Sequence, residues 1–228
     1  MKLFKKLHFC TMTKLSLPSS ILIIAVVFSA CRGPEARENE NNASANLTSL
    51  SPVENEKYSI DKKESAVTYK GSMVLVSKGA HTGYVYISKG ELLMDKGQLV
   101  GGTVELDMNT IADVDHGSEN ELVRHLKSSD FFDVEKFPFS AFAITMVAPS
   151  TSETVNVTGN LTIKGITHAV TFPAKIEVKD GVVHATGNVS IDRTQWNVRY
   201  KSGKFLGTLA DETISDDIEF DMKIVAKK

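Results

Sequence analysis

Apolar and polar residues alternate along most of the chain from residue 57 onward. The alternation is strict over 155–164, 167–178, 183–192 and 218–224, and weaker over 65–76, 83–88, 99–108 and 139–147, with a short lead-in at 58–61. A period of two, bounded by turn residues such as Asp180 and Gly181, is typical of antiparallel strands with one apolar and one polar face. The pattern predicts eight or nine strands.

A sheet of this many antiparallel strands must hide its edges, and closure into a barrel does so fully. The run 167–179 would be about 43 Å long at ~3.3 Å per residue. Ordinary strands have about 5–6 residues. We therefore expect an all-β fold, an extended antiparallel β-barrel of about eight strands.

Small residues on the predicted inward faces indicate a hollow interior: Gly102, Gly159, Ala174, Ala185 and Gly187. The alternative is that each glycine marks a bulge or a barrel corner. Larger apolar residues on the inward faces are the candidates for lining an elongated apolar lumen: Val104, Leu106, Phe142, Ile144, Val157, Leu161, Val170, Phe172, Ile176, Val189, Ile218 and Phe220.

A helical pattern interrupts the strands after the fourth long one. Ser118-Glu-Asn-Glu121 matches a capping box, and an apolar stripe then continues to Lys127. Ser128 and the residues after it could cap a second short turn, so we expect one or two short helices here. Four phenylalanines around this region are expected to plug one barrel end, with a gating role as the alternative: Phe131, Phe132, Phe137 and Phe139.

The N-terminus differs from the rest of the chain. Four lysines precede a short apolar run at 21–28, which is shorter than the roughly 20 residues of a spanning helix. A basic start, a short apolar centre and small residues before a boundary describe a secretion signal. Because Phe28-Ser-Ala-Cys31 resembles the lipobox of bacterial lipoproteins, we expect residues 1–30 to be a lipoprotein signal peptide and Cys31 to be lipidated. An ordinary cleaved signal is the alternative.

Residues 31–56 contain almost no large apolar side chain and are rich in Asn, Glu and Ser. Such a segment cannot bury enough surface to fold, so we expect a tether for a barrel domain at 57–228. The lipoprotein resemblance associates Arg32, directly after the cysteine, with outer-membrane retention. We therefore expect a lipid-anchored protein of the bacterial cell envelope, at the outer membrane and facing the periplasm.

Composition narrows the function classes. The chain has 228 residues, 24% of them charged, and a formal net charge of −2, which argues against a nucleic-acid binder. The sequence contains no Gly-x-Ser-x-Gly, Gly-x-x-x-x-Gly-Lys-Ser/Thr, His-Glu-x-x-His or Gly-x-Gly-x-x-Gly motif. We expect neither catalysis nor a cofactor. A hydrolase or isomerase on the barrel would have His81, Asp115 and His116 to use.

The segment Asp113-Val-Asp115-His116, with His125 nine residues later, contains carboxylate and imidazole groups that can bind metals. A solvated loop with capping acids explains the same pattern, and we predict no metal site. His81, at the start of a strand, is a candidate for holding a polar head group at the barrel mouth. A hydrogen bond to backbone is the alternative role for this histidine.

The segments Arg193-Thr-Gln-Trp196 and Arg199-Tyr-Lys201-Ser-Gly203 combine cations and aromatic rings in one loop. Such a loop can grip a phosphate or quinone head group. The alternative is that Arg193 pairs with Asp216 or Asp217 and locks the barrel. The head-group candidates are thus His81, Arg193, Trp196 and Tyr200.

Several separate motifs occur in order between about residues 58 and 225. They are His81-x-Gly83, Gly90, His125-Leu-Lys-Ser-Ser-Asp-Phe-Phe132, Phe137-Pro138, Thr158-Gly-Asn-Leu-Thr-Ile-Lys-Gly165-Ile-Thr-His-Ala-Val-Thr-Phe172, Arg193-Thr-x-Trp196, Tyr200-x-Ser-Gly203 and Asp216-Asp217. Together they resemble the YceI-like polyisoprenoid-binding family. The resemblance implies an exported, lipocalin-like barrel that holds an isoprenoid amphiphile, such as a quinone or polyprenyl phosphate, without catalysis. It also implies that a homodimer is common.

Two function hypotheses follow. The first is a membrane-tethered carrier or store of an isoprenoid lipid, with Cys31 as the membrane anchor. The second is a ligand-free envelope scaffold or partner-binding lipoprotein, which predicts a lumen filled by side chains.

Overall fold

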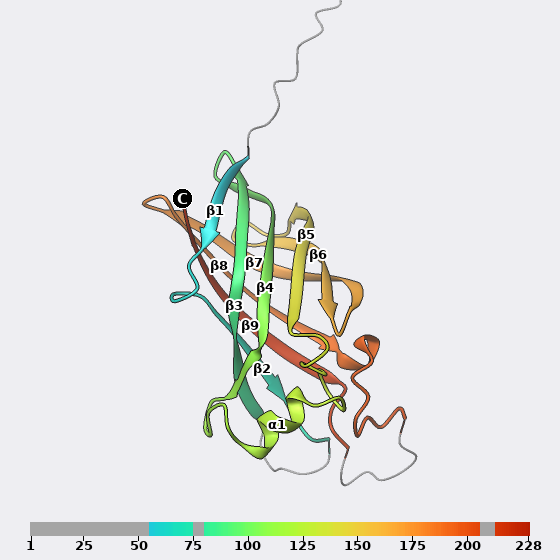
Figure 1. Ribbon diagram of the computed structural model, residues 1–228. Coiled ribbons are helices and arrows are strands. Elements are labelled where there is room, and N and C mark those ends of the chain that lie inside the picture. Colours follow the sequence, from blue (N-terminus) through green and yellow to red (C-terminus); the bar gives the residue numbers. More distant parts are fainter. Residues whose placement is uncertain (1–54, 75–79, 206–212) are drawn as a thin grey trace, which may run out of the picture. The chain divides into compact units, whose positions relative to one another are not determined.

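The computed structural model describes residues 55–74, 80–205 and 213–228, so the expected signal peptide, Cys31 and nearly all of the tether lie outside the described residues. The described part is almost entirely strands (Figure 1). The elements in chain order are β1 Glu56–Ile60, β2 Ala66–Gly71, β3 His81–Asp95, β4 Gln98–Asp113, α1 Glu121–Lys127, β5 Phe139–Pro149, β6 Val155–Ile163, β7 Ile166–Lys179, β8 Val182–Asp192, the 3-10 turn η1 Arg193–Trp196, and β9 Asp217–Lys227.

The strands form one closed antiparallel barrel. Neighbours from β3 to β9 pair in chain order, and β2 closes the circle by pairing with both β3 and β9. The short β1 pairs with the same two strands farther along them, so β1 and β2 share one position in the barrel. Nine described strands therefore fill eight positions, which confirms the expected barrel.

The long strands make the barrel tall. Strands β3, β4 and β7 have 15, 16 and 14 residues, against the usual 5–6 or so. Three hairpins join long strands through the two-residue turns Lys96-Gly97, Lys164-Gly165 and Asp180-Gly181, and all six residues have positive φ. Such turns match the right-handed twist of the strands they connect. They set the register that brings alternate side chains into the barrel.

Helix α1 lies across one end of the barrel, as Figure 1 shows. Its N-cap is Asn120, whose side chain accepts a hydrogen bond from the Val123 N–H at 3.0 Å. The expectation that Ser118 begins a capping box is therefore wrong by two residues, because the Asn120 side chain accepts the N–H of Val123, the third residue of α1. No helix in the described part of the chain is long and apolar enough to cross a membrane.

Candidate lipid-binding cavity

An elongated cavity of about 420 Å³ lies inside the barrel. Strands β2 to β9 all contribute to its wall, and α1 contributes side chains at one end. The volume lies in the range of about 300–1,000 Å³ that is usual for ligand pockets. All twelve residues expected on the inward faces line it: Val104, Leu106, Phe142, Ile144, Val157, Leu161, Val170, Phe172, Ile176, Val189, Ile218 and Phe220.

The small inward residues play two different roles. Three of them border the open space, namely Ala174, Ala185 and Gly187. Gly159 instead packs directly against the Phe142 ring: a Cβ at this position would lie 2.4 Å from Phe142 Cζ. Gly102 has a φ of 146° and a Cβ there would lie 2.5 Å from the Glu91 carbonyl oxygen. For these two glycines the close approach of neighbours, and not open space, explains the residue.

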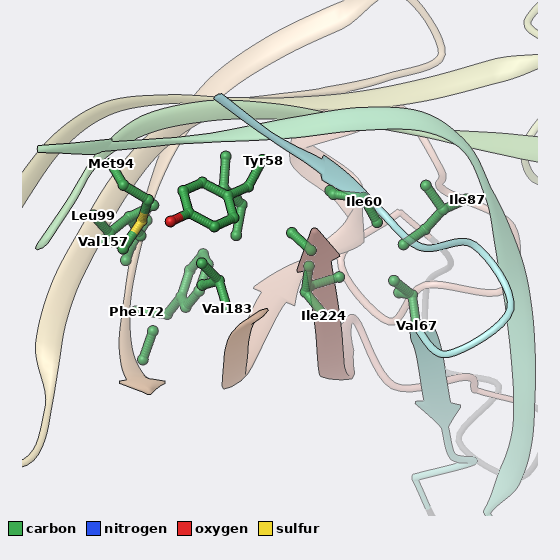
Figure 2. Close-up of a cluster of buried hydrophobic side chains, with 13 residues drawn as sticks. Tyr58, Ile60, Val67, Ile87, Met94, Leu99, Val157, Phe172, Val183 and Ile224 are labelled. Carbon is green, nitrogen blue, oxygen red and sulfur yellow. The ribbon is translucent and has the colours of Figure 1, made fainter. Parts of the chain in front are cut away.

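The end of the barrel formed by the β3–β4 hairpin is filled by apolar side chains. Figure 2 shows Tyr58 of β1 beside Met94 and Leu99 of this hairpin, with Phe172 and Val183 in the same cluster. Met94 is 1% exposed and Val183 is fully buried. Among the residues that the structure describes, those lining the cavity here, such as Leu92, Leu99 and Phe172, are apolar.

The opposite end, under α1, has its own plug. Val123, Leu126 and Phe131 are buried there together with residues of β4 and the loops. Of the four phenylalanines expected to form the plug, Phe131 is buried in this cluster and Phe132 packs against it. The expectation is wrong for Phe139, which is 48% exposed on β5, because its position in the alternation faces outward.

Polar side chains of the cavity gather at the α1 end, which we call the polar end and define by His81, His125, Arg193, Tyr200 and Lys201. His81 lines the cavity while its side chain is 56% exposed, so the cavity reaches solvent here. Among the residues that the structure describes, the lining contains no Asp or Glu. The cavity is thus apolar along its length and polar at one mouth, which suits an amphiphile.

Arg193 is buried at the polar end and its guanidinium is held by the backbone. Nε donates to Ser215 O at 2.9 Å, Nη1 to Val198 O at 2.8 Å and Nη2 to Ile214 O at 3.2 Å. Nη2 also lies 3.6 Å from Asp216 Oδ1. Burial lowers the pKa of Arg193, and the charge of Asp216 opposes that shift. The locking role, with Asp216 as the partner, accounts for these contacts.

His125 and Tyr200 form an aromatic wall at the polar end. Their ring centroids are 4.4 Å apart in an edge-to-face arrangement, and the His125 ring also meets Phe131 edge-on at 5.1 Å. His125 Nε2 lies 3.2 Å from Asp130 Oδ2. The wall therefore carries a histidine that is already hydrogen-bonded to a carboxylate on its far side.

Sequence comparison decides the family at this point. The family model described as the YceI-like domain matches residues 58–226. This chain belongs to the YceI-like family. A UPF0312 protein of Pseudomonas putida strain W619 is 32% identical over 103 residues, which are 42% of this chain and 53% of that protein. A UPF0312 protein of Shewanella denitrificans is 29% identical over 123 residues, covering 51% and 60%. The chain thus spans between half and two thirds of the relatives it matches.

Two solved structures share the fold of this YceI-like domain. Burkholderia cenocepacia BcnA superposes with a TM-score of 0.61 at 21% identity, covering 74% of this chain and 99% of that one. A polyisoprenoid-binding domain from Saccharophagus degradans, implicated in plant cell wall breakdown, gives a TM-score of 0.55 at 12% identity, covering 75% and 97%. At these identities the likeness concerns the fold.

Of the family motifs, those that contain His81, His125, Arg193 and Tyr200 meet at the polar end, with Trp196 as an exception in its role. Trp196 is 2% exposed and is not among the residues lining the cavity. Its indole N–H donates to Leu161 O at 3.1 Å, and its ring meets His168 edge-on. Trp196 therefore packs behind the wall, and we no longer place it among the head-group candidates; His81, Arg193 and Tyr200 do border the cavity.

The loop after β4 explains the Asp–His cluster of this YceI-like domain. Asp113 Oδ1 accepts hydrogen bonds from the backbone N–H groups of Asp115 and His116, each at 2.9 Å, and lies 2.9 Å from His116 Nδ1. Side-chain atoms of these three residues come within 4.8 Å of one another. The contacts are those of a capping acid that closes a loop. His125 stands apart from this cluster, paired with Asp130.

Some cavity residues were not found from the sequence. Tyr69, Ser72 and Met73 line the polar end, and all three fall in the run 65–76, where the alternation is weak. The Tyr69 hydroxyl donates to Ala112 O at 3.2 Å. Burial, with a smaller contribution from the charge of Asp113, raises the pKa of Tyr69. From the sequence, Tyr69 could be placed only within the weak alternation over 65–76.

Proposed function

We propose that this protein binds an amphiphilic isoprenoid-type lipid, of the quinone or polyprenyl phosphate class, with the tail in the cavity and the head group at the polar end. The single observation that carries the proposal is an apolar cavity of about 420 Å³ whose polar groups gather at one mouth. The polyisoprenoid-binding domain from Saccharophagus degradans, which shares the fold, adds support. The second hypothesis, a ligand-free scaffold, predicts a filled lumen and is disfavoured by the same cavity.

Tail burial supplies the affinity in this proposal. Burying a methylene contributes ~0.8 kcal/mol, so one isoprene unit contributes about 2–4 kcal/mol before ordering costs. A micromolar complex requires about 8 kcal/mol. Several isoprene units are therefore needed, and long isoprenoids should bind more tightly than short ones.

We further propose that the protein is a membrane-tethered carrier or store, anchored through Cys31 at the outer membrane and facing the periplasm. The support is the sequence around Cys31 and the composition of the 25 or so residues that follow it. No catalytic step is part of the proposal.

Organic extraction of the purified full chain followed by mass spectrometry tests the binding function. We expect an isoprenoid lipid in the extract of the wild type and of Ala169→Phe, which adds a ring to the exposed outer face of β7. Ala185→Phe adds the same ring inside the cavity and should lose the lipid. An empty wild-type protein that also fails to take up added long-chain isoprenoids would reject the proposal and favour the scaffold.

A further inference from the structure

The basic side chains that border the cavity at the polar end are already engaged by other groups. His125 Nε2 lies 3.2 Å from Asp130 Oδ2, and His81 Nδ1 lies 3.7 Å from Asp113 Oδ2. The Arg193 guanidinium donates hydrogen bonds to three backbone carbonyls and lies 3.6 Å from Asp216 Oδ1. The Lys201 ammonium lies 5.8 Å from the Tyr200 ring centroid and has further interactions.

The placement of the carboxylates is consistent across this end. Among the described residues, Asp113, Asp130 and Asp216 do not border the cavity, and each lies within 3.7 Å of a basic side chain that does. The ligand would therefore meet hydrogen-bonding groups whose charge is already balanced. Asp216 is in turn shared between Arg193 and Lys204, whose Nζ lies 3.5 Å from Asp216 Oδ2.

A phosphate head group fits such a mouth poorly. It carries about −1.5 to −2 charges and is recognised by cations that direct several donors at it. Moving the charged phosphate out of water costs free energy when no unpaired cation receives it. A neutral head group, such as a quinone carbonyl or an alcohol, needs just a donor or acceptor, and the rings of His81, His125 and Tyr200 present these at the cavity wall.

We infer that the polar end selects an isoprenoid with an uncharged head group, of the quinone or alcohol class, against the corresponding phosphate. The inference rests on the proposed function, because it chooses between the two ligand classes named there. The carboxylate of Asp130 is the clearest determinant, because it lies 3.2 Å from the ring of His125, which lines the cavity, and does not itself border the cavity.

The test compares ligands that share one tail and differ in the head. Geranylgeraniol, menaquinone-4 and geranylgeranyl phosphate all carry a geranylgeranyl chain. Their affinities are measured by competition against one fluorescent isoprenoid, on the full chain with Cys31→Ser so that no anchor lipid competes, at about pH 8 where an ordinary histidine is neutral. We expect the two neutral ligands to bind at least about tenfold more tightly than the phosphate.

Two variants of one loop separate this cause from a general effect of charge. Asp130→Asn removes the carboxylate behind His125 and should reduce the preference for neutral heads by about threefold or more. Asp133→Asn removes a carboxylate that pairs with Lys136, at a positive-φ position that asparagine tolerates, and should leave the preference unchanged.

The outcomes distinguish the inference from the function it rests on. Equal or tighter binding of the phosphate would overturn the inference while leaving isoprenoid binding in place. An equal response of the two variants would overturn the role of Asp130. Failure of all three ligands to bind would overturn both the inference and the proposed function.

Discussion

At the scale of single residues, Arg193 is a buried cation of the cavity wall that depends on several partners. Its side chain is 1% exposed, and removing one partner of a buried, hydrogen-bonded charge leaves the others unpaired. The partners here are three backbone carbonyls and Asp216, whose Oδ1 is itself buried without a hydrogen bond. The residue thus joins the segment after β8 to the start of β9.

We predict that Arg193→Met reduces the free energy of unfolding by about 3–5 kcal/mol, because the three carbonyl oxygens lose their donor and Asp216 loses an ion-pair partner. Urea denaturation followed by circular dichroism measures the loss. Arg199→Met is the matched control, since Arg199 is exposed and its guanidinium lies over Phe205 at 4.6 Å; it should cost less than about 1 kcal/mol. Equal costs for the two variants would contradict the assignment.

Residues of the cavity wall were more predictable than residues of its mouth. Val157, Phe172 and the other inward residues follow from alternation, because a period of two assigns every side chain of a strand to one face. The two roles considered for Arg193 could not be separated from sequence, since both use the same guanidinium in the same loop. Trp196 was misplaced for a similar reason: a 3-10 turn has no alternation from which to tell inside from outside.

At the scale of elements, the loop from Asp113 to α1 shows how one side chain organises a connection. Asp113 accepts from two backbone N–H groups and Asn120 caps the helix that follows. The hairpin turns were readable because glycine after Asp or Lys permits positive φ. The helix cap was less readable, because Ser118 and Asn120 are both favourable caps and the choice depends on where α1 packs.

The cap assignment gives a direct prediction. Asn120→Ala should lower the free energy of unfolding by about 1 kcal/mol, because the Val123 N–H loses its acceptor. Ser118→Ala, at an exposed position two residues earlier, should change it by less than about 0.5 kcal/mol. Thermal or urea unfolding compares them, and a larger loss for the serine variant would restore the capping box.

Asp113 predicts a dependence of stability on pH. Burial by itself raises the pKa of Asp113. The hydrogen bonds from the His116 ring and from the backbone N–H groups of His116 and Asp115 together lower it by more, so the pKa lies below its usual value. A lowered pKa contributes stability above the unfolded value near ~3.9. That contribution is lost as the pH falls through the folded pKa.

Measurement of the unfolding free energy between about pH 6 and pH 3 checks this, since the relevant pKa lies below ~3.9. We expect the wild type to be more stable than Asp113→Asn at the upper end and its advantage to shrink toward the lower end. Taking the difference between the two proteins removes the shared contribution of other carboxylates with lowered pKa values, such as Asp61 and Asp192. A difference that stays constant with pH would contradict the role of Asp113.

At the scale of the whole molecule, the closed barrel was predictable because many long amphipathic strands have few ways to hide their edges. Its hollow interior was harder to establish. Small residues mark open space at Ala185 but close packing at Gly159, and a sequence pattern cannot separate these cases. Volume is a property of all the side chains together.

The expected lipid anchor gives a prediction about where the protein acts. If Cys31 is lipidated, an acyl-anchored chain stays with the membrane because stable anchoring follows from more than one buried acyl chain. Cys31→Ser should therefore move the protein from the membrane fraction to the soluble fraction of the envelope and abolish incorporation of radiolabelled palmitate. Cys10→Ser removes the other cysteine of the chain, inside the expected signal peptide, and should change neither result.

The same pair of variants separates anchoring from ligand binding. The cavity is built from residues of β2 to β9 and α1, so Cys31→Ser should retain bound isoprenoid on extraction even though it leaves the membrane. Loss of the lipid together with the anchor would mean that the barrel takes up its ligand only when held at the bilayer. Palmitate incorporation that persists in Cys31→Ser would refute the lipid anchor itself.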